Sequence, residues 1–402
     1  MKKILIIETE FEGHYLTGYI KYILRSFKKK DVSITLLTSE DAKKKAHGAF
    51  EILKKENVKF NVTSIPIIKN KNYTSVALLC AQIKLYFLIK KNFRLINAKI
   101  KYDHVFVTSV QKFDKALVLF GTPFGRVSFS GIFLGVKFHL ENFGISQKSR
   151  FNFLSKKFFQ QLLSIRTLQC IITNDHLLSE LFNSQKYKNH NKLKFLHDPK
   201  EFNFKYEKFN SRKKMGLPKK SLIVLVYGAL IESKGIVELL SIFKIQELNV
   251  DIRVVLAGKQ LGTIKNLLEK DNLVKKLKSN KKLFLFNNWL SEKDEARIFS
   301  ATDIVWIGYK NYTSPSGVLY QAVNKSLPIL ISNDGLIHHL NKKINVGYSV
   351  DISNPIKIID GINFIINKKN MKKLKKNIKN FSKIADAKKW VINFKKIHSS
   401  LY

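Results

Sequence analysis

The segment Thr313–Ala322, which reads TSPSGVLYQA, and the apolar segment Leu327–Ser332 that follows it decide the fold of this chain. The first is a small polar loop that runs into a predicted helix, and the second has the composition of a buried strand. Such a helix start presents backbone N–H groups at the positive end of the helix dipole, where phosphate oxygens bind. A similar loop, Tyr227–Gly235, lies upstream between another predicted strand and helix. Two such loops in one half of the chain indicate a site for a nucleotide diphosphate.

Predicted strands and helices alternate on both sides of these loops. The first half has predicted strands at 3–7, 33–38, 60–65, 104–110, 127–134, 168–173 and 193–196, with helices at 13–25, 40–56, 76–99 and 151–165. The second half has strands at 222–227, 252–257, 283–286, 304–307 and 328–331, with helices at 236–243, 262–277, 292–301 and 371–397. Such alternation implies parallel sheets with both faces covered. We therefore expect an α/β fold with two Rossmann-like doubly wound sheets.

The length of 402 residues predicts two domains, because it exceeds what one ordinary core holds. Residues 200–220 are polar and rich in lysine, and Met215–Pro218 has the composition of a turn. The predicted domain boundary falls in this stretch.

The chain is strongly basic, with 72 Lys and Arg against 30 Asp and Glu, a net charge of +42. One interpretation is an acidic partner such as nucleic acid, anionic lipid or a phosphorylated substrate. The other is the codon bias of an AT-rich genome, since lysine pairs recur along nearly the whole chain. No aromatic and basic recognition motif stands out, so no specific nucleic-acid partner is expected. An anionic membrane surface remains a candidate partner.

The cysteines and the N-terminus indicate the cytoplasm. Cys80 and Cys170 have no paired spacing, so neither a disulfide framework nor a metal knuckle is predicted. Glu8 and Glu10 end the first apolar run too early for a signal peptide, and we interpret the run as the first strand.

No predicted segment is apolar enough to span a membrane, because Lys84 and Arg126 interrupt the two longest candidates. The segment 151–165 has an amphipathic pattern of its own. One helical face carries Phe151, Leu154, Phe158, Leu162 and Ile165. Either this helix lies in the plane of a membrane or it packs on the first sheet, and the need of a parallel sheet for covering helices favours the second.

Five segments, in order and spacing, resemble the retaining, GT-B-fold glycosyltransferases of family 4. These segments are Arg212–Pro218, Gly228–Gly235, Val255–Gly258, Ala301–Val305 and Ser316–Ala322. The resemblance implies two Rossmann-like domains that face each other across a cleft. It places the acceptor on a domain of residues 1–200 and a nucleotide-sugar donor on residues 201–385. A C-terminal helix, 386–402, would return to the N-terminal domain.

The resemblance also implies roles for individual residues. Lys234 matches the lysine that contacts the donor diphosphate, where a fixed cation stabilises charge on the leaving group. Ser316, Gly317 and Val318 match the loop whose amides hold the same diphosphate, although Ser316 could equally be a plain helix cap. The remaining donor-binding candidates are Gly228, Gln321 for the ribose and Thr313 for the sugar.

The sequence departs from the family pattern at three places. Ala229 stands where an arginine is usual, and Ser326 or Leu327 stands where a glycine is usual before a later proline. Thr313 and Gln321 replace the usual pair of glutamates. An amide oxygen accepts hydrogen bonds as a carboxylate does, so Gln321 can still bind ribose hydroxyls. Thr313 is a poorer match for the residue that grips the donor sugar.

Three residues of the first half are candidates for the reacting end. Gly13 and His14 follow the first strand and are candidates for acceptor binding, the alternative being a tight turn with a solvent-facing histidine. His139 follows the strand at 127–134, where the family often places a cleft histidine. We therefore expect His139 and Lys234 to be the catalytic residues.

No Asp-x-Asp and no His/Cys cluster with ligand spacing is present, so we expect no metal and no cofactor beyond the donor substrate. The resulting hypothesis is a bacterial glycosyltransferase that builds a surface glycan on a lipid-linked acceptor. It would be cytoplasmic, either free or peripheral on the inner face of the membrane. The alternatives are a catalytically degenerate GT-B protein that binds a glycan or a partner, and a sugar-nucleotide epimerase of the same fold.

Overall fold

The chain forms two compact units. The computed structural model describes residues 1–9, 15–28, 31–39, 47–54, 56, 60–65, 75–245 and 249–401. Unit 1 consists of Met1–Pro199 and Ala387–Tyr402, and unit 2 of Lys200–Asp386. The sequence analysis placed its boundaries after residues 200 and 385.

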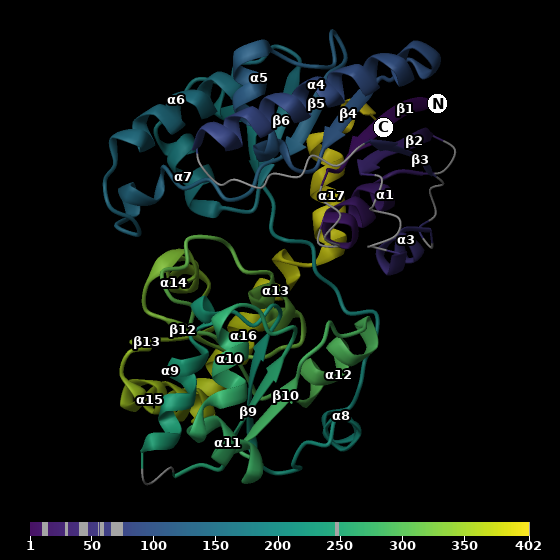
Figure 1. Ribbon diagram of the computed structural model, residues 1–402. Coiled ribbons are helices and arrows are strands. Elements are labelled where there is room, and N and C mark those ends of the chain that lie inside the picture. Colours follow the sequence, from purple (N-terminus) through teal and green to yellow (C-terminus); the bar gives the residue numbers. More distant parts are fainter. Residues whose placement is uncertain are drawn as a thin grey trace. The chain divides into compact units, whose positions relative to one another are not determined.

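Unit 1 is built on a parallel sheet whose described strands follow the order β3-β2-β1-β4-β5-β6-β7 (Figure 1). The strands are β1 Lys2–Ile7, β2 Val32–Ser39, β3 Phe60–Ile65, β4 His104–Val107, β5 Ser128–Ile132, β6 Leu168–Thr173 and β7 Leu193–Phe195. The strand residues are mainly apolar because helices cover both faces of the sheet.

Alternate residues of β1 enter two different cores, as the twofold repeat of a strand requires. Ile4 and Ile6 join one core, and Leu5 and Ile7 join the other. The first core is covered by η1 Leu16–Ile20, α1 Lys21–Ser26, α3 His47–Lys54 and α17 Ala387–Ile397. The second is covered by α4 Ser75–Ile100, α5 Asp114–Phe120, α6 Arg150–Leu163 and α7 His176–Ser184.

The single C-terminal helix predicted at 371–397 is in fact two helices. α16, Lys368–Ile384, belongs to unit 2, and α17 belongs to unit 1. α17 lies beside α1 although the two are far apart in sequence (Figure 1). Trp390 and Phe394 of α17 are buried in the core of unit 1.

Unit 2 repeats the same strand order, β10-β9-β8-β11-β12-β13, and its strands are all parallel. The strands are β8 Leu222–Tyr227, β9 Ile252–Ala257, β10 Leu283–Phe286, β11 Ile304–Ile307, β12 Ile329–Ser332 and β13 Gly347–Val350. The sequence analysis did not predict β13.

Helices cover both faces of this second sheet. α9 Ile236–Leu240, α10 Thr263–Lys270, α11 Asn272–Ser279 and α15 Pro355–Ile366 pack with Val224 and Val226. α12 Glu292–Ala301, α13 Gly317–Asn324 and α14 Gly335–Ile344 pack with Ile223 and Leu225, and α8 Lys208–Lys214 contacts α12. The helix predicted at 262–277 is divided because the Asp271 carboxylate accepts a hydrogen bond from the Val274 amide, 3.0 Å, and starts α11.

The amphipathic helix α6 has a packed C-terminal half and an exposed first turn, so the interpretation as a helix packed on the first sheet holds for part of its length. Its C-terminal half packs on the sheet, where Phe159, Leu162 and Leu163 are buried. Its first turn is different, since Phe151 is 77% exposed and Phe153 58%. None of the helices in the described part of the chain is long and apolar enough to cross a membrane.

Candidate functional site

In each unit the strand order reverses at the first strand of the sheet. In unit 2 this strand is β8, which pairs with β9 on one side and with β11 on the other. A crevice forms at the carboxyl ends of the strands where the order reverses, and such sheets bind their ligands there. The loops 228–235 and 308–316 leave β8 and β11 at this end.

Glycines allow the first loop to approach the neighbouring strands. Gly235 has φ +62°, and a Cβ atom there would lie 2.0 Å from the carbonyl oxygen of Gly308. Gly228 has φ +90°, and a Cβ atom there would lie 3.1 Å from Nζ of Lys234. A side chain at either position would therefore be strained, and one at Gly228 would also crowd the lysine ammonium.

Lys234 is a buried cation with few partners. Its side chain is 9% exposed, Nζ donates to the Tyr227 carbonyl oxygen, and the Tyr309 ring centroid lies 5.3 Å away. No ion pair joins it to a carboxylate among the residues described here. Burial lowers the pKa of Lys234 to about 8, because desolvation disfavours the charged form. A nearby anion would reverse that shift.

The second loop brings the start of α13 to the same end of the sheet. Ser316 occupies the N-cap position and is buried, yet its side chain makes no capping hydrogen bond. The first amides of α13, those of Gly317 and Val318, are therefore not taken by the cap. Tyr309 of this second loop contacts the first, because its ring faces Lys234, and its hydroxyl hydrogen-bonds with Ser316 farther along its own loop. Burial raises the pKa of Tyr309 to about 12.

Gln321 is held by a carboxylate that the sequence analysis did not identify. The Gln321 amide nitrogen donates to Glu295 of α12, and the Tyr227 hydroxyl also hydrogen-bonds with Glu295. Burial raises the pKa of Glu295, and the nearby Lys200 opposes that shift. No local motif marks Glu295, which the sequence shows only as part of an acidic first helical turn. Thr313 lies half-buried in the loop before α13.

Of the candidate site residues predicted in unit 1, the structure describes only His139. Gly13 and His14 lie outside the described residues. The His139 ring is fully buried, with Nε2 2.9 Å from Oδ2 of Asp175, although the two atoms are not aligned for a hydrogen bond. Asp175 also caps α7 by accepting from the amides of Leu177 and Leu178. A ring without exposure does not line a binding surface in this conformation, so a catalytic role of His139 stays a prediction.

A buried carboxyl that the sequence analysis treated only as the end of a strand lies at the corresponding point of unit 1. Glu8 follows β1, and the Thr108 hydroxyl, which follows β4, donates to it. Burial raises the pKa of Glu8 to about 8, against the opposing effects of Thr108 and Lys112. A carboxyl group that is protonated near neutral pH can donate a hydrogen bond to a ligand oxygen.

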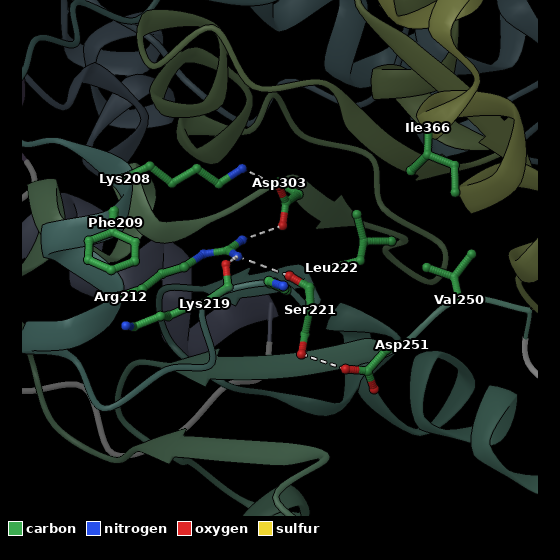
Figure 2. A pocket seen from close by; sticks show the side chains of 11 residues that line it. Lys208, Phe209, Arg212, Lys219, Ser221, Leu222, Val250, Asp251, Asp303 and Ile366 are labelled. Carbon is green, nitrogen blue, oxygen red and sulfur yellow. Dashed lines mark hydrogen bonds and ion pairs between the residues drawn. The ribbon is translucent and has the colours of Figure 1, made fainter.

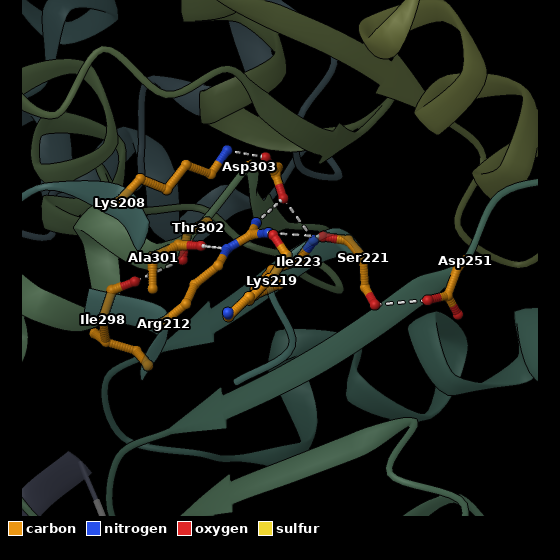
Figure 3. Close-up of polar contacts among 10 residues, drawn as sticks. All are labelled: Lys208, Arg212, Lys219, Ser221, Ile223, Asp251, Ile298, Ala301, Thr302 and Asp303. Carbon is orange, nitrogen blue, oxygen red and sulfur yellow. Dashed lines mark hydrogen bonds and ion pairs between the residues drawn. The ribbon is translucent and has the colours of Figure 1, made fainter. Parts of the chain in front are cut away.

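A hollow of about 530 Å³ lies at the opposite, amino end of the unit 2 strands (Figure 2). Arg212 lies beneath it and donates to the carbonyl oxygens of Ala301, Lys219 and Ser221 and to the Asp303 carboxylate (Figure 3). Asp303 in turn also pairs with Lys208. Because these charged groups already have partners, we interpret this end of the sheet as a structural contact that holds α8 against the strands and α12.

Among the described residues, no group of three or more His, Cys, Asp or Glu side chains could hold a metal ion. The polar groups at the carboxyl end of the unit 2 sheet are instead a buried ammonium, free helix amides and an amide held by a carboxylate. Such a set can bind a diphosphate and hydroxyl groups.

Residues 207–383 match the sequence profile of the family described as Glycosyl transferases group 1. The match spans most of unit 2 and is to the sequence of that unit alone. A search of curated protein sequences found no match to the chain.

Solved structures show the same fold over the whole chain. Anabaena Alr3699/HepE in complex with UDP and glucose has 14% identity and a TM-score of 0.68, with 100% of both chains covered. Sucrose-phosphate synthase from Thermosynechococcus elongatus has 12% identity and a TM-score of 0.71, with 100% of this chain and 99% of that chain covered. UDP-GlcNAc 2-epimerase from Neisseria meningitidis has 12% identity and a TM-score of 0.65, with 99% and 100% covered. With the two Rossmann-like sheets, these similarities confirm the predicted GT-B fold.

Proposed function

We propose that this protein is a glycosyltransferase that moves a sugar from a nucleotide-sugar donor to a glycan acceptor. The family resemblance implies that the sugar is a hexose. The observation that carries the proposal is Lys234, a buried ammonium that has no carboxylate partner among the described residues. It lies at the carboxyl ends of β8 and β11, in the unit that matches the group 1 profile. A diphosphate is the anion that this position and the adjacent start of α13 would bind best.

In this mechanism the bond between the sugar and the diphosphate breaks, and negative charge develops on the leaving β-phosphate. Lys234 and the amides of Ser316–Val318 stabilise that charge, and removal of one such donor typically costs ~3–4 kcal/mol of transition-state stabilisation. Gly228 leaves room for the ammonium, Gln321 binds the ribose and Thr313 contacts the sugar. We further propose retention of the anomeric configuration, a lipid-linked acceptor bound by unit 1, and no need for a metal ion.

The first test is binding. A panel of nucleotide sugars is screened for thermal stabilisation, because a ligand that binds the native state raises its stability. Incubation of the best donor with the protein in excess EDTA, followed by NMR, then separates the functions. Sugar release or transfer supports the proposal, whereas an altered sugar still attached to the nucleotide indicates an epimerase. Binding without turnover indicates a degenerate binding protein.

A second part of the proposal places the protein at an anionic membrane from the cytoplasmic side. The first turn of α6 exposes Phe151, Phe153 and Leu154, and the net charge of the chain is +42. The structure changes which aromatic residues can insert. Phe159 is buried against Phe138 and Phe182, and Phe158, which belongs to the predicted apolar face, is half-buried. Phe151 and Phe153 are therefore the aromatic residues of α6 that can insert.

Co-sedimentation with anionic and neutral vesicles tests the membrane proposal. Binding should be strong on anionic vesicles at low salt and fall as salt rises, since screening acts over about 8–10 Å. The double variants Phe151→Ser/Phe153→Ser and Lys156→Glu/Lys157→Glu should each bind less. The matched control, Lys275→Glu/Lys276→Glu on α11, should lose less. A wild-type protein that stays in the supernatant at low salt refutes this part of the proposal.

A further inference from the structure

A continuous set of hydrogen bonds connects two sides of the proposed donor site. Lys234 Nζ donates to the backbone oxygen of Tyr227, and the Tyr227 hydroxyl hydrogen-bonds with Glu295. Glu295 also accepts from Nε2 of Gln321. Three elements therefore meet beside the end of β8: the strand itself, α12 and α13.

The hydrogen bond to Glu295 fixes the orientation of the Gln321 amide. A carboxamide has a donor end and an acceptor end, whereas a carboxylate only accepts. The amide nitrogen must therefore face Glu295, and Oε1 then points away from it. Gln321 is only 8% exposed, which leaves its side chain few other positions.

We propose that Glu295 is a positioning residue of the donor site, which orients Gln321 so that its Oε1 accepts hydrogen bonds from the vicinal hydroxyls of the nucleotide ribose. This inference rests on the proposed function. It also offers an account of how the site can work without a carboxylate at position 321, since α12 supplies the negative charge and Gln321 transmits its effect to the ligand. Tyr227 holds Glu295 from the other side and couples it to the backbone that binds Lys234.

Paired ligands test the inference. Uridine, adenosine and guanosine diphosphates and their 2′,3′-dideoxy analogues are titrated by calorimetry, and the base that binds wild type best is used. Glu295→Gln frees the amide to turn over, and we expect affinity for the ribonucleotide to fall about tenfold, as for the loss of one well-oriented acceptor. Affinity for the dideoxy analogue should stay within about twofold of the wild-type value, because the analogue lacks the hydroxyls from which Oε1 of Gln321 would accept hydrogen bonds.

Exchange of the two side chains provides the second arm. Gln321→Glu alone places two carboxylates in contact and should weaken ribonucleotide binding. The double variant Glu295→Gln/Gln321→Glu restores one amide and one carboxylate with their roles exchanged, and affinity should recover to within about threefold. The control Asp294→Asn makes the same charge change on the exposed surface of α12 and should bind as wild type does.

The outcomes separate the two proposals. Equal losses for the ribonucleotide and its dideoxy analogue, or no loss in Glu295→Gln, overturn the role of Glu295 while the proposed function stands. A double variant that binds no better than Gln321→Glu does the same. A wild-type protein that binds no nucleoside diphosphate overturns the proposed function and this inference with it.

Discussion

Unit 2 buries one cation at each end of its sheet, and the two are held in opposite ways. At the amino ends of the strands, the Arg212 guanidinium donates to three backbone carbonyls and to Asp303. At the carboxyl ends, Lys234 donates to one carbonyl and faces the Tyr309 ring. The hollow of about 530 Å³ lies at the arginine end.

This difference separates a cation that holds the fold together from one that we propose binds a ligand. The partners of Arg212 recover what burial of its charge costs, and they join α8 to the strands and to the end of α12. Lys234 lacks a counter-charge within the described structure. Burial therefore lowers its pKa without an opposing effect from a carboxylate. In unit 2, a buried charge without a counter-charge is thus a better guide to a candidate site than the size of a hollow.

The largest expected effect is on stability, at the arginine end. Arg212→Ala leaves three carbonyl groups without the guanidinium donor and leaves Asp303 with Lys208 as its remaining cation, and we expect a loss of ~3–5 kcal/mol in unfolding free energy. Arg212→Lys should recover only part of this, because an ammonium cannot reproduce the fork of the guanidinium. Denaturant titration measures both. A loss under 1 kcal/mol would contradict the structural role.

At the lysine end the effect should fall on activity. Lys234→Ala should lower kcat/KM by about two to three orders of magnitude, equivalent to ~3–4 kcal/mol, because it removes the cation at the leaving diphosphate. Its thermal stability should equal or exceed that of wild type, since a buried charge with a single hydrogen bond is lost. Lys357→Ala on exposed α15 is the control and should keep full activity. Activity of Lys234→Ala within a few-fold of wild type would rule out the assignment.

The charge state of Lys234 predicts how binding depends on pH. The ammonium is lost as pH rises through about 8, so the affinity for a nucleoside diphosphate should fall roughly tenfold between pH 7 and pH 9. Lys234→Arg should show no such fall, because arginine stays charged. Stability changes in the other direction: the unfolded chain binds more protons at this lysine between pH 8 and 10.5, so its contribution to stability rises with pH there. Calorimetry at several pH values measures the affinity for the nucleoside diphosphate. An affinity that does not change with pH would contradict the prediction.

The smallest effect concerns the two kinds of helix start in unit 2. Ser316 makes no capping bond to α13, so Ser316→Ala should cost well under the ~1 kcal/mol of a true cap but weaken diphosphate binding a few-fold. Asn354, by contrast, caps α15 by accepting from the amides of Ile356 and Lys357. Asn354→Ala should therefore cost ~1 kcal/mol in unfolding free energy and leave binding unchanged. Equal stability losses in the two variants would remove the distinction.

The sequence predicts the strands better than it predicts the contacts between helices. β8 and β9 have the predicted bounds, because a strand buried on both faces appears as an unbroken apolar run. Helix breaks were missed where one side chain decides them, as at Asp271. The elements missed altogether include β13 and the helices α5, α7, α8, α14 and α15.

The same limit applies to the candidate site. The loops around Lys234 and Ser316 could be found because turn chemistry is local. The role of Glu295 could not, because its contact with Gln321 depends on how two helices pack. His139 likewise lies against a residue that is distant in the sequence, Asp175. Local patterns thus identify the candidate loops, and tertiary packing decides which side chains lie beside them.

The placement of α17 has a consequence for how the protein is synthesised. Unit 2 is one continuous stretch, whereas the core of unit 1 needs Trp390 and Phe394 from beyond unit 2. In most multidomain chains the N-terminal domain folds first on the ribosome. Here the N-terminal unit cannot complete its core until nearly the whole chain has been made, so the second unit can reach its native state before the first. During that interval the apolar surface that α17 later covers is exposed, and such surface makes a nascent chain prone to aggregation.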